Sequence, residues 1–141
     1  PPAMAQSNAP SDASAVAAAC GGELQEAAFN ALPAAKQREK LGCFTREAAK
    51  IFNKTLPSKI DDATTLQKVS ADGTMLTYHY SVNILKSELR PEVLDAFKPS
   101  VTEKVCAASD MKLIIRIGGS YRYLWFDRNN ELMGELIVSE C

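Results

Sequence analysis

The stretch TTLQKVSADGTMLTYHYSV, residues 64–82, decides the fold. It contains two runs rich in β-branched and aromatic residues, 64–71 and 74–82, and the dipeptide Asp72-Gly73 separates them. An Asp-Gly pair between two such runs is the strongest short-range signal for a β-hairpin. The stretch therefore predicts two antiparallel strands joined by a tight turn.

The second run divides between two faces, because successive side chains of a strand point to opposite sides of the sheet. One face is expected to carry Leu76, Tyr78, Tyr80 and Val82, and the other Met75, Thr77, His79 and Ser81. The first set is the larger and more apolar one, so we expect it to face the core.

Helical patterns precede the hairpin. Apolar residues recur at helical spacing within residues 23–32, which predicts a short helix. Pro33 suits the first turn of a second, amphipathic helix, which has a weak point at Gly42. This helix ends at Leu56-Pro57, because the residue before a proline disfavours helical dihedral angles. Its apolar side comprises Leu41, Phe44, Ala48, Ile51 and Phe52.

Short helices and a second hairpin follow. Proline is favoured in the first turn of a helix, so Pro91 and Pro99 each predict a helix start. Leu113-Ile114-Ile115 fits either a helix or a strand, because periodicity cannot settle so short a run. The expected segments are helices at 91–97, 99–107 and 110–117 and strands at 120–127 and 131–139.

This order of helices, hairpin, helices and hairpin predicts the α+β class. We expect N-terminal helices and a four-stranded antiparallel sheet with helices packed on one face, stabilised by disulfide bonds. Residues 23–141 are predicted to form a single domain. Residues 1–22 contain almost no large side chain to bury, so we predict a disordered leader or cloning remnant. Two interpretations of Ala3-Met4-Ala5 stay open: the end of a signal-peptide cleavage site, and a cloning scar, which we favour.

Four cysteines, Cys20, Cys43, Cys106 and Cys141, point to an oxidising compartment. They allow three pairings, and the sequence does not choose among them. We favour Cys20–Cys43 and Cys106–Cys141, which join sequential neighbours. Two alternatives stay open: free thiols in a cytosolic protein, and lipid attachment at Cys20, against which the polar residues upstream of it argue.

The composition argues against several classes of protein. With 16 basic and 17 acidic residues the net charge is -1, and no basic stripe with interleaved aromatic residues predicts a nucleic-acid partner. No apolar run approaches the roughly 20 residues that a membrane-spanning helix needs. We expect no cofactor, because Gly118-Gly119 lacks the Lys and Ser/Thr of a phosphate loop. We expect no metal, because a zinc site needs several His or Cys ligands and His79 has no cysteine nearby.

His79 is the only histidine and so the only candidate for histidine-based catalysis. It lies on the strand face opposite Tyr78 and Tyr80, where a surface histidine is expected. A glycosidase needs two carboxylates that flank a cleft, and the adjacent residues Asp61 and Asp62 do not supply that geometry. We therefore predict no catalytic residue, and we keep an enzyme that uses His79 as a second alternative.

Apolar side chains occupy both faces of the strand predicted at 120–127. One set must face the helices, and the other is available for recognition, in which tyrosine and tryptophan are favoured. The alternative is a sheet that is covered on both sides. The candidate binding surface comprises Tyr78, Tyr80, Tyr121, Arg122, Tyr123 and Trp125.

Several segments together resemble a family of small secreted or envelope proteins of bacteria. LPSKIDDATTL, residues 56–66, with Val69-Ser70 after it, is similar to the family's opening pattern LPxxxDxxTxL…VS. LTYHY, residues 76–80, resembles its strand LTYxY, and Val105-Cys106 resembles its helix-borne VC. The C-terminal resemblance rests on Tyr121-Arg122-Tyr123, Asp127, Asn129 and the terminal Cys141.

The resemblance covers residues 50–141 and departs from the family at Asn130, where the family has glycine. It implies an extracytoplasmic location and a Cys106–Cys141 bond. The family has no established activity, so the resemblance implies no catalytic residue.

The leading hypothesis is a periplasmic or secreted protein of a Gram-negative bacterium, with its signal peptide removed. We expect a monomeric, non-enzymatic binding or adaptor module for a protein or peptide partner in the cell envelope. The first alternative is an inhibitor or immunity-type protein that blocks an envelope enzyme through residues 83–90 or 128–130.

Overall fold

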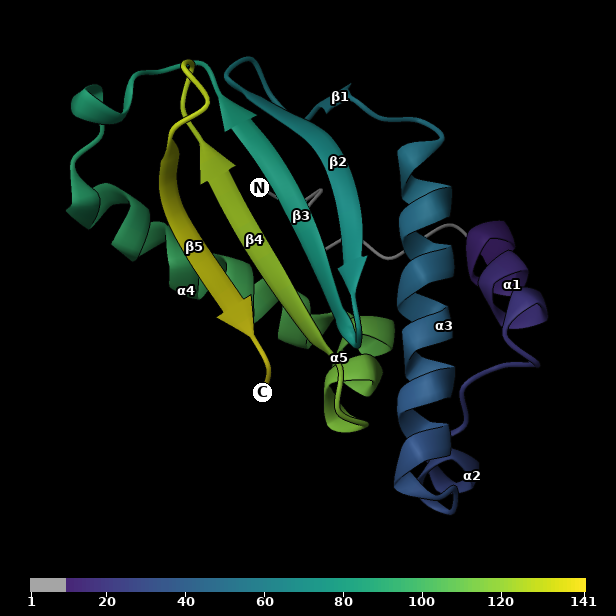
Figure 1. Cartoon of the computed structure of the whole chain (residues 1–141). Helices are drawn as coiled ribbons and strands as arrows, with labels where there is room; N and C mark the ends of the chain where they lie inside the picture. Colours follow the sequence, from purple (N-terminus) through teal and green to yellow (C-terminus); the bar gives the residue numbers. More distant parts are fainter. Residues whose placement is uncertain (1–9) are drawn as a thin grey trace.

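The computed structural model describes residues 10–141, and their side chains from Ser14 onward. A five-stranded sheet with the order β1-β2-β3-β4-β5 forms its centre (Figure 1). The strands are β1 (Ser58–Lys59), β2 (Thr64–Asp72), β3 (Met75–Val82), β4 (Ser120–Phe126) and β5 (Leu132–Val138). The helices are α1 (Pro10–Ala19), α2 (Glu26–Asn30), α3 (Ala34–Asn53), the short 3-10 helix η2 (Lys86–Glu88), α4 (Pro91–Ala107) and α5 (Ser109–Arg116). The predicted α+β class is confirmed.

The hairpin predicted from residues 64–82 is present as β2 and β3. Asp72 pairs with Met75, so Gly73 and Thr74 form a two-residue turn. Gly73 has a left-handed φ of 60°. Glycine at the first central position is the residue that type II′ hairpin turns prefer, because other residues rarely adopt that angle.

The sheet differs from the expected four-stranded antiparallel one in two respects. The two-residue strand β1 adds a fifth member at the edge of β2. In addition, β3 and β4 pair in parallel, with Met75 beside Ser120 and Ser81 beside Phe126. The reason is the helical connection through α4 and α5, which returns the chain to the end of the sheet where β3 began; parallel neighbours require a crossover of this kind.

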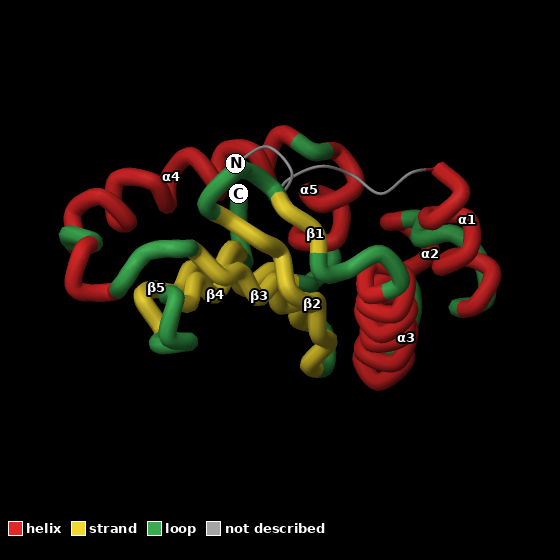
Figure 2. Tube along the Cα trace, turned by 90° about the horizontal axis from the view of Figure 1, so that it is seen from above, coloured by secondary structure: helices red, strands yellow, loops and turns green. Residues whose placement is uncertain are grey.

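Helices α4 and α5 cover one face of the sheet, as predicted, and α3 packs beside β2 (Figure 2). The residues expected to form two helices, 91–97 and 99–107, form the single helix α4, with Pro99 inside it. Val101 and Val105 are fully buried, and their packing holds the part of α4 that follows the proline. Residues 113–115, for which helix and strand were both open, belong to α5.

Aromatic rings fill the space between the sheet and the helices. Neighbouring strands place Tyr78 and Tyr123 side by side, with ring centroids 5.0 Å apart and nearly parallel planes. Phe52 of α3 meets Tyr78 edge-on, and Phe97 of α4 meets Trp125 edge-on. Edge-to-face and offset stacked pairs are favourable arrangements of aromatic rings, so these contacts join the helices to the sheet.

The segment predicted as a disordered leader, residues 1–22, contains the helix α1. Its Val16 and Ala17 are buried, and α1 packs against α3. The alanine-rich sequence supplies the highest intrinsic helix propensity, and the bond between Cys20 and Cys43 ties the end of α1 to α3. Residues 1–9, and with them Ala3-Met4-Ala5, lie outside the described residues.

Both favoured disulfide pairings are confirmed. Cys20 is bonded to Cys43, and Cys106 of α4 is bonded to Cys141 after β5. All four cysteines are therefore engaged, and none is free for lipid attachment or thiol chemistry.

A buried carboxylate organises the turn between β4 and β5. Asp127 accepts hydrogen bonds from the backbone N–H groups of Asn129 and Glu131, each at 2.8 Å, and from that of Lys86 at 2.9 Å. These bonds favour the charged form, and the one from Glu131 contributes most to lowering the pKa of Asp127. Asn130 adopts a left-handed φ of 63°, which asparagine tolerates.

This carboxylate predicts a pH-dependent part of the stability. Because the pKa of Asp127 is lower in the folded chain than its usual value of 3.8, its contribution is complete above that value and is lost as the pH falls through the folded pKa. We expect Asp127→Asn to lower the free energy of unfolding at pH 7, and the difference from the wild type to shrink below pH 3.8. Urea unfolding of both proteins across this range measures it. A constant difference at all pH values would contradict the prediction.

Candidate functional site

A cavity of about 500 Å³ lies between α1, α3 and α5, and the ends of β3 and β4 form its floor. Phe44, Ala48 and Phe52 of α3 form one wall, and Leu113 and Ile114 of α5 form the opposite wall. The side chains that contribute polar atoms to the lining are Ser14, Glu23, Thr45, Asp110, Ser120 and the two tyrosines Tyr78 and Tyr121. We name this space the α1–α3–α5 cavity.

The wall from α3 follows from the spacing of its residues. Phe44, Ala48 and Phe52 are four residues apart, so they share one side of the helix. The adjacent side carries Leu41 and Ala49, which are buried. The apolar side of α3 is thus wider than the part that packs on the sheet, and Phe44, Ala48 and Phe52 line the cavity.

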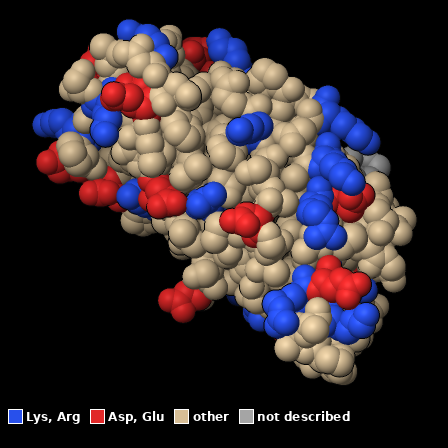
Figure 3. All heavy atoms as spheres, viewed as in Figure 1, with Lys and Arg blue, Asp and Glu red and all other residues tan. Residues whose placement is uncertain are grey.

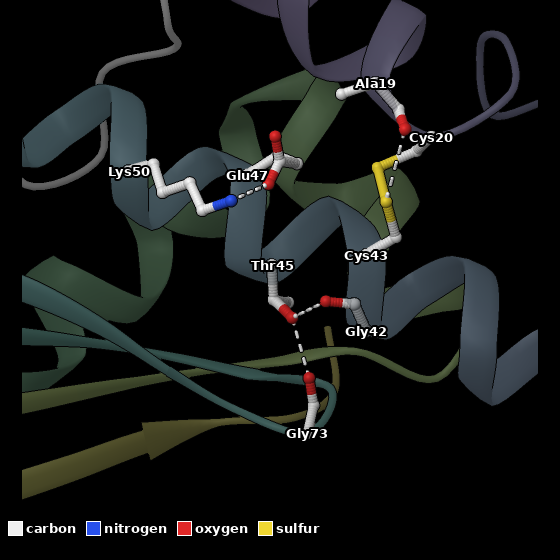
Figure 4. The surroundings of a disulfide bond; sticks show 8 residues. All are labelled: Ala19, Cys20, Gly42, Cys43, Thr45, Glu47, Lys50 and Gly73. Atoms are coloured by element: carbon white, nitrogen blue, oxygen red, sulfur yellow. Dashed lines mark hydrogen bonds and ion pairs between the residues drawn. A yellow bond between two sulfur atoms is a disulfide. The ribbon is translucent and has the colours of Figure 1, made fainter.

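A hydrogen bond between α3 and the hairpin turn fixes the position of this wall. The hydroxyl oxygen of Thr45 lies 2.7 Å from the carbonyl oxygen of Gly73 and 2.9 Å from that of Gly42 (Figure 4). A Cβ atom at Gly42 would come within 3.7 Å of the Gly73 carbonyl oxygen. The glycine predicted as a weak point of the helix therefore faces the hairpin turn, at a distance where a Cβ atom would make ordinary van der Waals contact with it.

Helix α1 forms a third wall through Ser14, Val16 and Ala17. The helix ends at Gly21, whose φ is 82°, and the N–H of Gly22 donates to the carbonyl oxygen of Ala17 at 2.7 Å. This is the hydrogen bond of a glycine-terminated helix end. The Cys20–Cys43 bond next to it holds this wall against α3 (Figure 4).

The floor of the cavity is aromatic and neutral. Burial raises the pKa of the Tyr78 and Tyr121 hydroxyl groups well above the usual value of 10. Both hydroxyls therefore stay protonated at neutral pH. The floor offers aromatic surface and no negative charge of its own.

The six residues of the predicted binding surface do not form one exposed surface. Five of them are buried in the core: Tyr78, Tyr80, Tyr121, Tyr123 and Trp125 are all less than 8% exposed. They face the helices because α4 and α5 cover that side of the sheet. Tyr78 and Tyr121 also line the α1–α3–α5 cavity, so only these two remain within a candidate site.

Arg122 lies on the other side of the sheet, because it alternates with Tyr121 and Tyr123 along β4. Its Nε donates to the hydroxyl of Thr77 at 3.1 Å, and its guanidinium lies 3.8 Å from the carboxylate of Glu135. We name this side, which faces away from α4 and α5, the outer sheet face.

His79 also lies on the outer sheet face and does not line the cavity. Its Nε2 is 2.9 Å from the hydroxyl of Ser70, and its ring stacks on Phe126. Partial burial, with smaller contributions from the charges of Lys68 and Arg122, lowers the pKa of His79. The hydrogen-bond partner of His79 is thus a hydroxyl group, and the two side-chain charges that lower its pKa, those of Lys68 and Arg122, are both positive.

Sequence reasoning missed part of the cavity. The apolar side of α3 was visible in the sequence, but the contribution of α1 depends on a segment that was predicted to be disordered. The Cys20–Cys43 pair was the available signal, because a disulfide at Cys20 requires the preceding chain to lie close to α3.

Within residues 10–141, no cluster of His, Cys, Asp and Glu side chains fits a metal ion. None of the helices seen there combines the length and apolar character needed to cross a membrane.

The sequence matches no protein-family model and no curated protein. Three solved structures share the fold. One is a Pseudomonas aeruginosa protein thought to be secreted, with a TM-score of 0.64 and 18% identity over 71% of this chain and 89% of that one. Another is EpsS, a pilotin of the type II secretion system of Vibrio vulnificus, with a TM-score of 0.64 and 13% identity over 74% of this chain and 93% of that one.

The third is AspS, a type II secretion system pilotin of Vibrio cholerae. Its TM-score is 0.60, with 19% identity over 75% of this chain and 94% of that one. At these identities the similarity shows a common fold. The fold of this chain is therefore one that also occurs in a protein thought to be secreted and in two pilotins of type II secretion systems.

Proposed function

We propose that this protein is a non-enzymatic, extracytoplasmic binding module that holds an apolar segment of a protein partner in the α1–α3–α5 cavity. The cavity itself is the observation that carries the proposal. Its volume of about 500 Å³ lies in the range of binding sites. Its walls carry apolar side chains from α1, α3 and α5, which is the chemistry of grooves that accept an apolar helix face.

Two features support an extracytoplasmic location, either periplasmic or secreted. Both disulfide bonds join well-separated segments, and such structural bonds persist in oxidising compartments. The similar solved structures include a protein thought to be secreted and two pilotins. A component of a type II or related secretion system is therefore the first class of partner to test.

Filling the cavity tests the proposal. Ala48 lines the α3 wall, and Ala48→Trp would occupy the space that a partner segment needs. We expect this variant to lose at least about tenfold in affinity for the partner, which corresponds to about 1.4 kcal/mol. The partner is the protein that the wild-type chain captures from native envelope extract and that mass spectrometry identifies, and affinity is then measured with that purified protein.

Ala35→Trp is the matched control, because it makes the same change at an exposed position of the same helix, away from the cavity. It should bind as the wild type does. A benzophenone amino acid at Glu23, which lines the cavity, should cross-link to the partner, whereas one at the exposed Glu103 of α4 should not. Equal binding by Ala48→Trp and the wild type, with both folded, would show that the cavity is not the site.

A further inference from the structure

Exposed large apolar side chains occur on the last strand of the sheet and on the helix that packs against it. Of the described residues, three large hydrophobic ones are strongly exposed: Val93 at 49%, Leu132 at 45% and Ile137 at 48%. Leu132 and Ile137 belong to β5, and Val93 belongs to the first turn of α4. None of the three lines the α1–α3–α5 cavity.

Strand β5 ends the sheet, because β4 is its only neighbour. An end strand directs a row of backbone N–H and C=O groups away from the sheet. Within residues 10–141, no hydrogen bond from outside the sheet reaches the backbone of Leu132–Val138. Proteins commonly protect such an edge with lysine, proline, other charged residues or a β-bulge. Strand β5, with the sequence LMGELIV, contains neither lysine nor proline, and it has one charged residue, Glu135, and a bulge near its start, opposite Trp125 and Phe126.

Helix α4 provides a support beside this edge. It passes behind β5 and extends beyond it, which both views show (Figures 1 and 2). Leu94 sits directly against Gly134, where a Cβ atom would overlap its side chain. Because Val93 precedes Leu94, the exposed valine lies next to the contact between α4 and β5. An additional strand beside β5 would therefore have a helix behind it, as β4 and β5 have.

We propose that the free edge of β5 binds an extended segment of another protein, which adds a sixth strand to the sheet. The backbone groups of an edge strand select an extended occupant, and the alternating side chains determine which sequences fit. On the outer sheet face such a segment would lie beside Leu132, Glu135 and Ile137. It would therefore carry apolar residues at alternate positions.

The negative charge of Glu135 indicates which residue the bound segment carries opposite it. The side chain of Glu135 is 46% exposed, and the one ion pair that it forms within the described residues, with Arg122, is long at 3.8 Å. Opposite charges on directly facing residues stabilise paired strands, whereas like charges destabilise them. The segment is therefore expected to have Lys or Arg opposite Glu135, between two apolar residues of the same face.

The same charge argues against a second copy of this chain as the occupant. The register that pairs all seven residues of two antiparallel β5 strands places Glu135 opposite Glu135. Two carboxylates would then face each other across the new pair.

Figure 3, which views the outer sheet face, shows uncharged surface interrupted by single charges over the strands, while Lys and Arg side chains gather over α3.

The test uses a phage-displayed library of random peptides, selected on the intact chain. We expect the enriched peptides to alternate apolar and polar residues and to carry a basic residue near the middle. Their binding should fall at least about tenfold in Ile137→Lys, because a charge then occupies the edge. On binding, backbone amides of β5 should become protected from hydrogen exchange.

Gln67→Lys is the matched control, because it introduces the same side chain at an exposed position of β2, on the other half of the sheet. It should bind the selected peptides as the wild type does. Ala48→Trp should also bind them, which separates this edge from the α1–α3–α5 cavity. The proposal is overturned if no peptide is enriched, if Ile137→Lys binds as well as the wild type, or if the chain dimerises through β5 in solution.

Discussion

Tyr80→Ala is expected to lower the free energy of unfolding by about 3–5 kcal/mol, the cost of removing a large aromatic side chain from a packed core. The Tyr80 side chain is fully buried. Its ring stacks between Tyr78, Tyr123 and Trp125, with centroids 6.3 to 6.5 Å away. The residue is paired with Leu66 of β2 on one side and with Trp125 of β4 on the other, so the sheet around it cannot easily collapse into the space. Urea unfolding followed by circular dichroism measures the loss.

Tyr80→Phe is the informative companion. The hydroxyl oxygen of Tyr80 is buried and has no hydrogen-bond partner within the described part of the chain. Burial also raises the pKa of this hydroxyl far above its usual value, so it is neutral. A buried polar group without a partner destabilises a protein, and its removal is close to neutral or stabilising.

We therefore expect Tyr80→Phe to change the free energy of unfolding by less than about 1 kcal/mol or to raise it. A loss for Tyr80→Phe as large as the loss for Tyr80→Ala would show that the hydroxyl has a partner. A small loss for Tyr80→Ala would show that the stacked rings contribute little to the core.

The aromatic residues of the predicted binding surface were expected to be available to a partner, and the structure buries them in the core. Along β4, Tyr121, Tyr123 and Trp125 occupy one face and Leu124 and Phe126 the other, so both faces are apolar. Alternation shows which residues share a face, but it does not show which face the helices cover. That choice depends on where α4 and α5 pack, and only the structure reveals it.

The sheet topology illustrates a similar limit. The period-two pattern of β3 and β4 is the same for parallel and antiparallel neighbours. The helical connection between them was visible in the sequence, and its length already fits a parallel crossover. The hairpin at Asp72-Gly73 was predicted correctly because its signal is local to the turn.

The cavity depends on three segments that are distant in the sequence. The apolar side of α3 could be predicted from the helical spacing of its residues, and the four cysteines indicated disulfide bonds between distant segments. Helix α1 was missed because its residues are small and its burial comes from contact with α3 and not from its own pattern. Local patterns thus predicted the elements, and contacts between elements created the candidate site.

Removal of the Cys106–Cys141 bond, by Cys106→Ala with Cys141→Ala, is expected to lower the free energy of unfolding by about 4 kcal/mol. The bond joins residues 35 apart in the sequence, and the chain-entropy model gives about this value for a loop of that length. It also holds the end of β5 to α4, where Cys106 follows the fully buried Val105. Both cysteines are replaced together, so that no free thiol remains to form a wrong bond.

Cys20→Ala with Cys43→Ala is the matched control for this prediction. The same model gives about 3 kcal/mol for its separation of 23 residues. However, α1 contacts mainly α3, so it can detach while the sheet remains folded. We expect a smaller decrease in the urea midpoint of the sheet, together with rapid hydrogen exchange in α1 and weaker binding at the α1–α3–α5 cavity. A larger decrease in the urea midpoint for Cys20→Ala with Cys43→Ala than for Cys106→Ala with Cys141→Ala would contradict this expectation. It would show that α1 unfolds together with the sheet.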